Sequence, residues 1–234
     1  MFKKKQDHYF KTRELVLWFA SMGIIVLSFI LFKGDSILTL AASLIGVTSL
    51  IYNAKGNPVG QFLMIMFSLL YGIISFSFAY YGEMMTYLGM TAPMALFSLI
   101  SWLKNPYNGN KAEVKVNSLK KMEVVFMFLL TIVVTIVFYF ILKAFHTANL
   151  IPSTISVTTS FLAVYLTFRR SAFFAIAYAA NDIVLLILWV MASLENITYL
   201  SVVVCFAVFF LNDLYGFVNW KKIHKRQTLH GTDV

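Results

Sequence analysis

Long apolar runs separated by short polar breaks dominate this chain of 234 residues. A helix needs about 20 mostly apolar residues to cross a bilayer core that is roughly 30 Å thick. Eight runs approach or reach that length, so the pattern predicts an all-α membrane protein with eight spans. Pro93 lies inside the fourth run and is expected to distort that helix. The predicted spans are residues 15–32, 36–53, 59–80, 84–103, 122–145, 150–168, 172–193 and 197–219.

The composition excludes a water-soluble domain. Apolar residues make up 60% of the chain and charged residues 12%, against about a quarter charged in soluble domains. A chain of this size could not hide so many apolar groups in one core. Cys205 is the single cysteine and the four histidines lie outside the predicted spans, so we expect no disulfide, metal or cofactor.

The basic residues orient the predicted spans. If the N-terminus is cytoplasmic, 17 of the 19 Lys and Arg residues lie on the cytoplasmic side, and only Lys33 and Lys143 face outward. The positive-inside rule therefore favours a plasma-membrane protein with both termini in the cytoplasm. This asymmetry also accounts for the net charge of +9, so nucleic acid is not an expected partner. The expected partners are the bilayer and a small molecule, and a homo-oligomer stays open.

Two segments of three spans resemble each other. Thr48-Ser49 and Thr159-Ser160 each lie within the first helix of a triplet. The triplets lead to Ser101-Trp102-Leu103-Lys104 and Asn219-Trp220-Lys221-Lys222, respectively. The sequence thus predicts an extra N-terminal helix (15–32), repeat one (36–103), a linker helix (122–145), repeat two (150–219) and a cytoplasmic tail (220–234). One intervening helix gives both triplets the same orientation, which is the parallel repeat found in some transporters.

Polar side chains inside the spans mark a candidate substrate site. A buried aspartate without a cationic partner is costly, and intramembrane polar residues usually face a cavity or the bundle interior. Asn181, Asp182 and Asn212 are therefore better explained by a substrate or proton role than by helix packing. The face of span 7 that holds the first two also holds Tyr178 and Trp189.

Further candidates for the same pocket are less specific. Span 3 offers Gln61, Ser68 and Tyr71, and span 8 adds Tyr215. Small polar residues in such spans often only pack helices together. Trp102 and Trp220 stand beside lysines, where an interfacial position and a ligand contact both remain open. A pocket with aromatic walls, amides and carboxylates suits a flat polar ring that bears hydroxyl groups.

Over roughly residues 37–226 the chain resembles the PnuC family of bacterial nicotinamide riboside transporters. The resemblance rests on Tyr81-Gly82-Glu83, on the asparagine of span 7 and on Asn212-Asp213-Leu214-Tyr215-Gly216 leading to Trp220-Lys221-Lys222. It implies a 3+1+3 arrangement with an extra N-terminal helix, similar to SWEET carriers with fused repeats. It also implies facilitated diffusion of the riboside, followed by trapping through cytoplasmic phosphorylation.

Carried over by position, Asn181 matches the asparagine of the family's span 7, and Asn212, Tyr215 and Trp220 match the family's terminal motif. Ser68 stands where the family often has asparagine, and the stretch before Asn181 lacks the family's tryptophan. These departures leave carriers of another vitamin or of a (deoxy)nucleoside as alternatives.

Functions of other classes fit the sequence less well. The motifs of intramembrane hydrolases are missing, and no mid-span lysine could hold retinal, so an enzyme or photoreceptor is not expected. A non-transporting membrane scaffold stays open.

Overall fold

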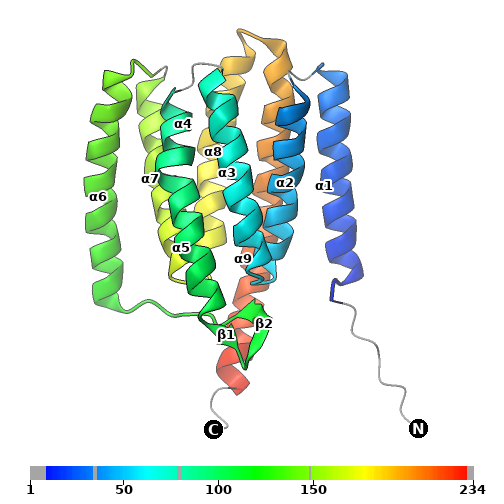
Figure 1. Cartoon of the computed structure of the whole chain (residues 1–234), viewed down its shortest axis with the longest axis vertical. Coiled ribbons are helices and arrows are strands. Elements are labelled where there is room, and N and C mark those ends of the chain that lie inside the picture. Colours follow the sequence, from blue (N-terminus) through cyan, green and yellow to red (C-terminus); the bar gives the residue numbers. More distant parts are fainter. Residues whose placement is uncertain (1–8, 34–35, 78–80, 148, 231–234) are drawn as a thin grey trace.

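The computed structural model describes residues 9–33, 36–77, 81–147 and 149–230. Within them, eight helical segments are long and apolar enough to cross a membrane, and they form one bundle (Figure 1). The eight-span prediction is thereby confirmed, although residues 78–80 of the third span lie outside the described residues. The segments are α1 (Thr12–Leu31), α2 (Ile37–Ala54), α3 (Val59–Ser77), α4 (Tyr81–Thr86) with a π turn (Tyr87–Thr91) and α5 (Ala92–Leu103), α6 (Lys121–Ala144), α7 (Leu150–Phe168), α8 (Phe174–Ser193), and a 3₁₀ turn (Ile197–Tyr199) with α9 (Leu200–His230).

The distortion expected at Pro93 takes the form of the π turn Tyr87–Thr91, which ends just before this proline. Proline lacks a backbone N–H and its ring displaces the preceding turn. A π turn accommodates this change and is often found at functional sites. Here it brings Tyr87 and Thr91 to the interior of the bundle, where both are buried.

A β-hairpin that the apolar pattern did not predict lies at one end of the bundle. Strands β1 (Pro106–Tyr107) and β2 (Asn110–Val114) pair antiparallel, and the two residues between them, Asn108 and Gly109, both have positive φ. An Asn-Gly pair is the usual two-residue hairpin turn because both residues tolerate that backbone. We call this end of the bundle the hairpin end.

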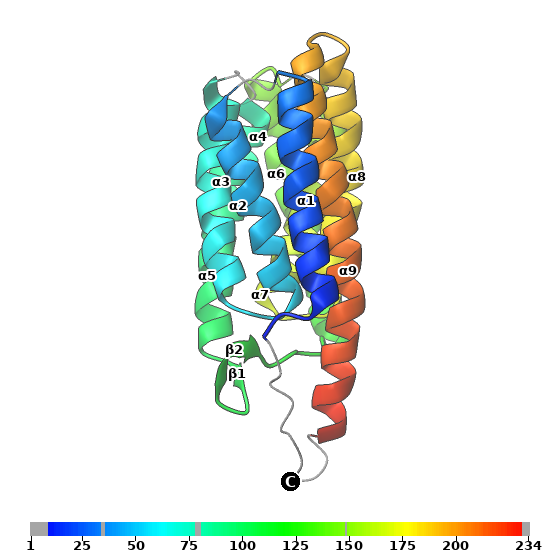
Figure 2. The ribbon, with the colours of Figure 1, turned by 90° about the vertical axis from the view of Figure 1, so that its right-hand side faces the viewer.

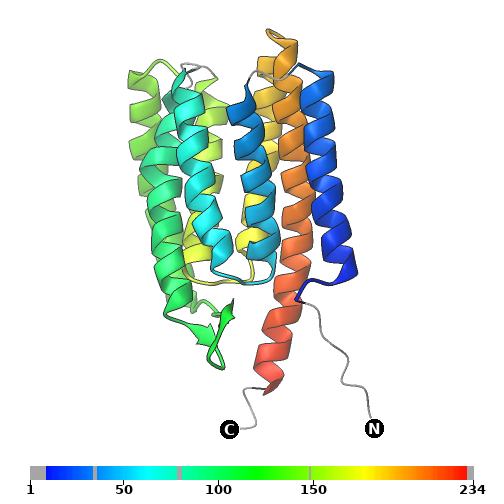
Figure 3. The same ribbon diagram turned by 45° about the vertical axis from the view of Figure 1, so that its right-hand side comes forward.

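Helix α9 continues well past its predicted end at residue 219 and reaches the hairpin (Figure 3). The predicted tail is thus helical through His230, while residues 231–234 lie outside the described part of the chain. Gln227 explains why the extension stays ordered, because its side chain is buried and bonds to the backbone of the hairpin segment at Val114 and Val116.

Helices α1 and α6 flank the bundle on opposite sides (Figure 1). Many large apolar side chains of α6, such as Phe126, Phe128, Leu129 and Phe140, are more than half exposed, as expected of a helix surrounded by lipid. Helix α1 lies against α9 and α2 (Figure 2). There Glu14 is almost completely buried and forms an ion pair with Lys55 at 2.9 Å.

Two matched hydrogen bonds connect α5 with α7 and α9 with α2 near the hairpin end. The indole N–H of Trp102 on α5 donates to the carbonyl of Thr167 on α7, at 2.9 Å. The indole N–H of Trp220 on α9 donates to the carbonyl of Asn53 on α2, at 2.7 Å. Thr167 and Asn53 are each the second-last residue of their helix. The last helix of each predicted triplet is therefore bonded to the first helix of the other predicted triplet.

Candidate functional site

A small cavity lies at the centre of the bundle, between the two predicted helix triplets. Its volume is about 30 Å³, and helices α2, α3, α7, α8 and α9 and the π turn all contribute to its wall. Three of the predicted site residues, Tyr178, Asn181 and Asp182, line it together. The other lining residues are Leu50, Met64, Phe67, Tyr87, Thr91, Ser160, Leu185, Phe206, Phe209 and Asp213.

Asn181 is held in place by three hydroxyl groups of the neighbouring helix α7. Its Oδ1 accepts hydrogen bonds from Thr159 at 2.8 Å, Ser160 at 3.0 Å and Ser156 at 3.3 Å. One oxygen is thus saturated and the orientation of the amide is fixed. Its Nδ2 group makes no hydrogen bond to any described residue, so two amide donors remain for a ligand.

Two carboxyl groups share the cavity. Asp182 on α8 and Asp213 on α9 are both buried and interact with each other electrostatically. Within the described residues, Asp182 Oδ2 has no hydrogen-bond partner and the cavity wall contains no Lys, Arg or His. Buried carboxyl groups without a cation are costly, so this pair is suited to bind a ligand that brings a positive charge or several hydroxyl donors.

Aromatic rings form the walls around these polar groups. The ring of Tyr87 packs at a tilt of 53° against that of Tyr71, with centroids 4.6 Å apart, and Tyr71 also contacts Phe206 at 6.0 Å and Trp189 at 6.4 Å. A Cβ at Gly46 would come within 2.4 Å of the Phe209 ring. Glycine at this position of α2 therefore lets that ring pack against the helix backbone.

Further space leads from the central cavity toward the end of the bundle opposite the hairpin. A narrow gap lined by Glu83, Tyr87, Ser160 and Leu188 adjoins it. Glu83 and Leu188 also line a larger cavity of about 170 Å³, together with Trp189 and Asn149. The three spaces share lining residues and form a discontinuous path from that end to the centre.

Other predicted residues lie away from this cavity. Asn212 donates from Nδ2 to Ser21 Oγ on α1 at 2.9 Å, and the hydroxyl of Tyr215 donates to Glu14 at 3.0 Å. Gln61 donates to Asn53 Oδ1 at 2.7 Å. Trp189 lines the larger cavity, and the ring of Tyr71 packs against Trp189. Ser68, on α3, is fully buried and lines neither cavity.

For Trp102 and Trp220 the sequence left open an interfacial position and a ligand contact, and the structure shows neither. Both are 0% exposed, which excludes an interfacial position, and neither lines the central cavity. Their rings pack together with centroids 5.4 Å apart. They are structural contacts between the two helix triplets.

Sequence reasoning did not select Asp213, Tyr87 and Thr91, which line the cavity. Asp213 directly follows Asn212, and adjacent helix residues point about 100° apart. Which of the two faces the cavity depends on the rotation of α9 in the bundle, and the sequence contained no signal for that rotation. For Tyr87 and Thr91 the available signal was Pro93, which places a helix distortion beside them.

An eight-span helix bundle with a buried polar cavity between two helix triplets defines a polytopic membrane transporter. The chain belongs to the nicotinamide mononucleotide transporter family, whose model matches residues 36–222. A relative, the nicotinamide riboside transporter PnuC of Neisseria mucosa, is 27% identical over an alignment of 222 positions, which covers 92% of this chain and 83% of the relative.

A solved structure has the same fold. The crystal structure of the vitamin B3 transporter PnuC superposes with a TM-score of 0.81 at 25% identity, covering 93% of this chain and 94% of the other. The resemblance to the PnuC family that the sequence motifs indicated is confirmed.

Proposed function

We propose that this chain takes up nicotinamide riboside across a bacterial plasma membrane by facilitated diffusion. The observation that carries the proposal is the central cavity, where the Asn181 amide, two carboxyl groups and several aromatic rings meet. Nicotinamide riboside offers matching chemistry: a flat cationic ring, a carboxamide and ribose hydroxyls. The name of the Neisseria mucosa relative and that of the solved structure support the same substrate.

Substrate binding requires the bundle to open. A cavity of about 30 Å³ holds little more than a water molecule, whereas the riboside is many times larger. The gap beside Glu83 separates this cavity from the larger one. Movement of α8 or of the π turn would join the two spaces and admit the ligand from the end opposite the hairpin.

The domain organisation proposed from the sequence has support in the hydrogen bonds. Repeat one (36–103) contains α2, α3 and α5, and repeat two (150–219) contains α7, α8 and most of α9. The matched bonds of Trp102 and Trp220 join equivalent positions of the two triplets, which is what a parallel repeat around a central axis requires. Helix α6 serves as the linker and α1 is the extra helix.

The hairpin end is proposed to face the cytoplasm. Lys55, Lys104, Arg169 and Lys221 all lie at helix ends or just beyond the apolar segments on that side, in accordance with the positive-inside rule. Uptake would then run toward the hairpin end, where phosphorylation of the riboside by a separate enzyme would trap it.

This orientation predicts a labelling pattern for single cysteines in a Cys205→Ala background. Asn110→Cys, in the exposed hairpin, should react with an impermeant thiol reagent only after permeabilisation. Glu195→Cys, in the exposed turn between α8 and α9, should react in intact cells. Labelling of Asn110→Cys in intact cells would overturn the orientation.

The cavity chemistry also predicts the form of the substrate. A phosphate group needs fixed cations or several donors to replace its hydration, and none of the residues that line the central cavity is basic. The carboxyl groups of Asp182 and Asp213 would repel it. We expect the riboside to bind at least tenfold more tightly than its mononucleotide in calorimetry with purified protein, an affinity difference of about 1.4 kcal/mol.

The binding experiment also separates the alternatives. A panel of riboside, mononucleotide, nicotinamide, thiamine, riboflavin and deoxynucleosides would identify a related carrier by its preferred ligand. Equal binding of riboside and mononucleotide would contradict the proposed site. Binding of none of them would favour a membrane scaffold.

A further inference from the structure

The matched tryptophan bonds are part of a larger set at the hairpin end. Ser101 precedes Trp102 and donates to the carbonyl of Phe168 at 3.0 Å. Asn219 precedes Trp220 and donates to the carbonyl of Ala54 at 2.7 Å. Phe168 and Ala54 are the last residues of α7 and α2. Each third helix therefore makes two hydrogen bonds to the final turn of the opposite first helix.

These bonds lie directly between the central cavity and the hairpin. Tyr178 lines the cavity and contacts Phe174, whose ring centroid is 4.8 Å from that of Trp220. Beyond Trp220, the same indole lies near Gly56 in the α2–α3 loop. A solute leaving the cavity toward the hairpin end would have to pass a layer of three buried rings, those of Phe174, Trp220 and Trp102.

A second layer covers the first on the outside. We call residues 105–118, which include the hairpin, the strap. Its backbone N–H groups donate to Gly56 of the α2–α3 loop (from Val114, 2.9 Å) and to Arg170 of the α7–α8 loop (from Asn117, 2.9 Å). The strap is thus bonded to the loop that follows the first helix of each triplet, and it crosses the space between these two loops.

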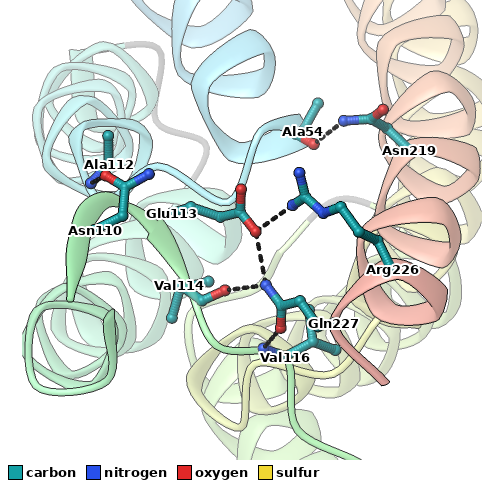
Figure 4. Close-up of polar contacts among 9 residues, drawn as sticks. All are labelled: Ala54, Asn110, Ala112, Glu113, Val114, Val116, Asn219, Arg226 and Gln227. Carbon is teal, nitrogen blue, oxygen red and sulfur yellow. Dashed lines mark hydrogen bonds and ion pairs between the residues drawn. The ribbon is translucent and has the colours of Figure 1, made fainter. Parts of the chain in front are cut away.

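The extension of α9 fastens the strap. Gln227 accepts from the N–H of Val116 at 2.8 Å and donates to the carbonyl of Val114 at 3.1 Å and to Glu113 Oε1 at 2.8 Å (Figure 4). Arg226 forms an ion pair with Glu113. Thr228, the next residue, is exposed and bonds only within its own helix, to the carbonyl of His224.

We propose that Trp102 and Trp220 are the gate of the hairpin end, and that the strap, held by Gln227, locks this gate closed. To open the path, α5 must part from α7 and α9 from α2, because these are the pairs that the four hydrogen bonds join. The bonds disfavour the open arrangement without contacting the substrate. The tryptophans are therefore positioning residues, and this inference rests on the proposed function of the chain as a carrier.

The gate is tested by the reactivity of a cysteine behind it. Leu50 lines the central cavity on α2 and is 5% exposed. In a Cys205→Ala background, Leu50→Cys reports access from one side when an impermeant maleimide is added to inverted membrane vesicles, where the hairpin end faces the reagent. The measurement needs no substrate, so its failure is distinct from a wrong substrate assignment.

Trp102→Phe combined with Trp220→Phe keeps two aromatic rings and removes both indole donors. Each lost bond should favour the open state by about fivefold, so labelling should accelerate by roughly 10- to 30-fold. Trp18→Phe is the matched control, because Trp18 also donates its indole N–H, to Thr48 Oγ1 at 3.2 Å, but within the α1–α2 contact. The control should label at the parent rate.

Gln227→Ala tests the lock without changing the core of the bundle. It should accelerate labelling several-fold, while Thr228→Ala should not. Labelling must rise only from the hairpin side: an equal rise in right-side-out vesicles would mean general loosening of the fold and would overturn the proposal. Parent-like rates in both the tryptophan pair and Gln227→Ala would overturn it as well.

Discussion

Replacement of Asn181 by leucine is expected to abolish measurable uptake of nicotinamide riboside while the protein still inserts into the membrane. The three α7 hydroxyls fix Oδ1 of this amide, and its Nδ2 donors remain for the ligand. Loss of one buried hydrogen bond to a ligand costs about 1–3 kcal/mol, a 5- to 150-fold loss of affinity. The measurement is radiolabelled uptake into proteoliposomes together with calorimetric binding.

The fold should tolerate this substitution because a serine or threonine hydroxyl in a helix can donate instead to a backbone carbonyl one turn earlier. Thr159, for example, already shares its hydroxyl with the carbonyls of Ile155 and Ser156. Asn181→Asp is a second test, since it keeps an oxygen for the hydroxyls but removes the amide donors, and it should also lose binding. Near-normal affinity in both variants would remove Asn181 from the site.

Asn212→Leu provides the matched control. The sequence alone predicts the same loss of uptake at Asn212 as at Asn181. In the structure its amide bonds to Ser21 and to the carbonyl of Val208, outside the central cavity. We therefore expect this variant to lower the thermal stability of the protein, because it weakens the α1–α9 contact. The affinity for the riboside should stay within about twofold of that of the parent protein. An equal loss of binding in both variants would mean that α1 belongs to the site.

The spans could be predicted because each requires only a run of apolar residues of sufficient length. The face of α8 was also predictable: Tyr178, Asn181 and Asp182 recur at helical spacing and do share one cavity. Polar residues within an apolar helix avoid the lipid and face the interior of the bundle. The spacing of such residues along the helix therefore indicates which side of the helix faces the interior.

The partners of individual side chains could not be predicted in the same way. Gln61 and Tyr215 are polar and lie inside spans, as predicted. They donate hydrogen bonds to Asn53 and Glu14, respectively, and do not reach the cavity. Which polar residue faces a cavity and which one faces another helix depends on the rotation of each helix in the bundle. That rotation is set by contacts between helices far apart in sequence.

The hairpin and the α9 extension show a second limit. The apolar pattern treats residues 104–121 as a polar break, although Asn108-Gly109 is a typical hairpin turn. Nothing in the local sequence of α9 indicates that Gln227 bonds to a strap over a hundred residues earlier. Turn chemistry could have indicated the hairpin, whereas the lock depends on tertiary structure.

Asp182→Asn is expected to lower riboside affinity by about 10- to 150-fold without creating or abolishing a response to a pH gradient. The carboxyl pair of Asp182 and Asp213 has no basic partner in the described cavity wall, and the proposed substrate has a cationic ring. A hydrogen bond or contact to a charged group is worth about 1.5–3 kcal/mol, which sets the expected loss. Binding of a neutral analogue with a reduced ring should fall much less.

The same variant separates facilitated diffusion from proton coupling. A proton carrier must exchange with both sides of the membrane. Glu83 lies between the carboxyl pair and the end opposite the hairpin. Toward the hairpin end, the ring of Tyr178 contacts Phe174, and Phe174 in turn contacts Trp102 and Trp220. Phenyl and indole rings carry no titratable proton near neutral pH, so the relay is interrupted on that side.

Wild-type proteoliposomes should therefore equilibrate riboside without any ion gradient, and an imposed pH gradient should not change the final level. Asp182→Asn should reach the same level, more slowly at low substrate concentration because its affinity is reduced. Asp213→Asn should behave alike, since its carboxyl group shares the cavity. Accumulation above the external concentration by the purified wild-type protein, driven by the gradient and lost in Asp182→Asn, would instead make this aspartate the coupling residue.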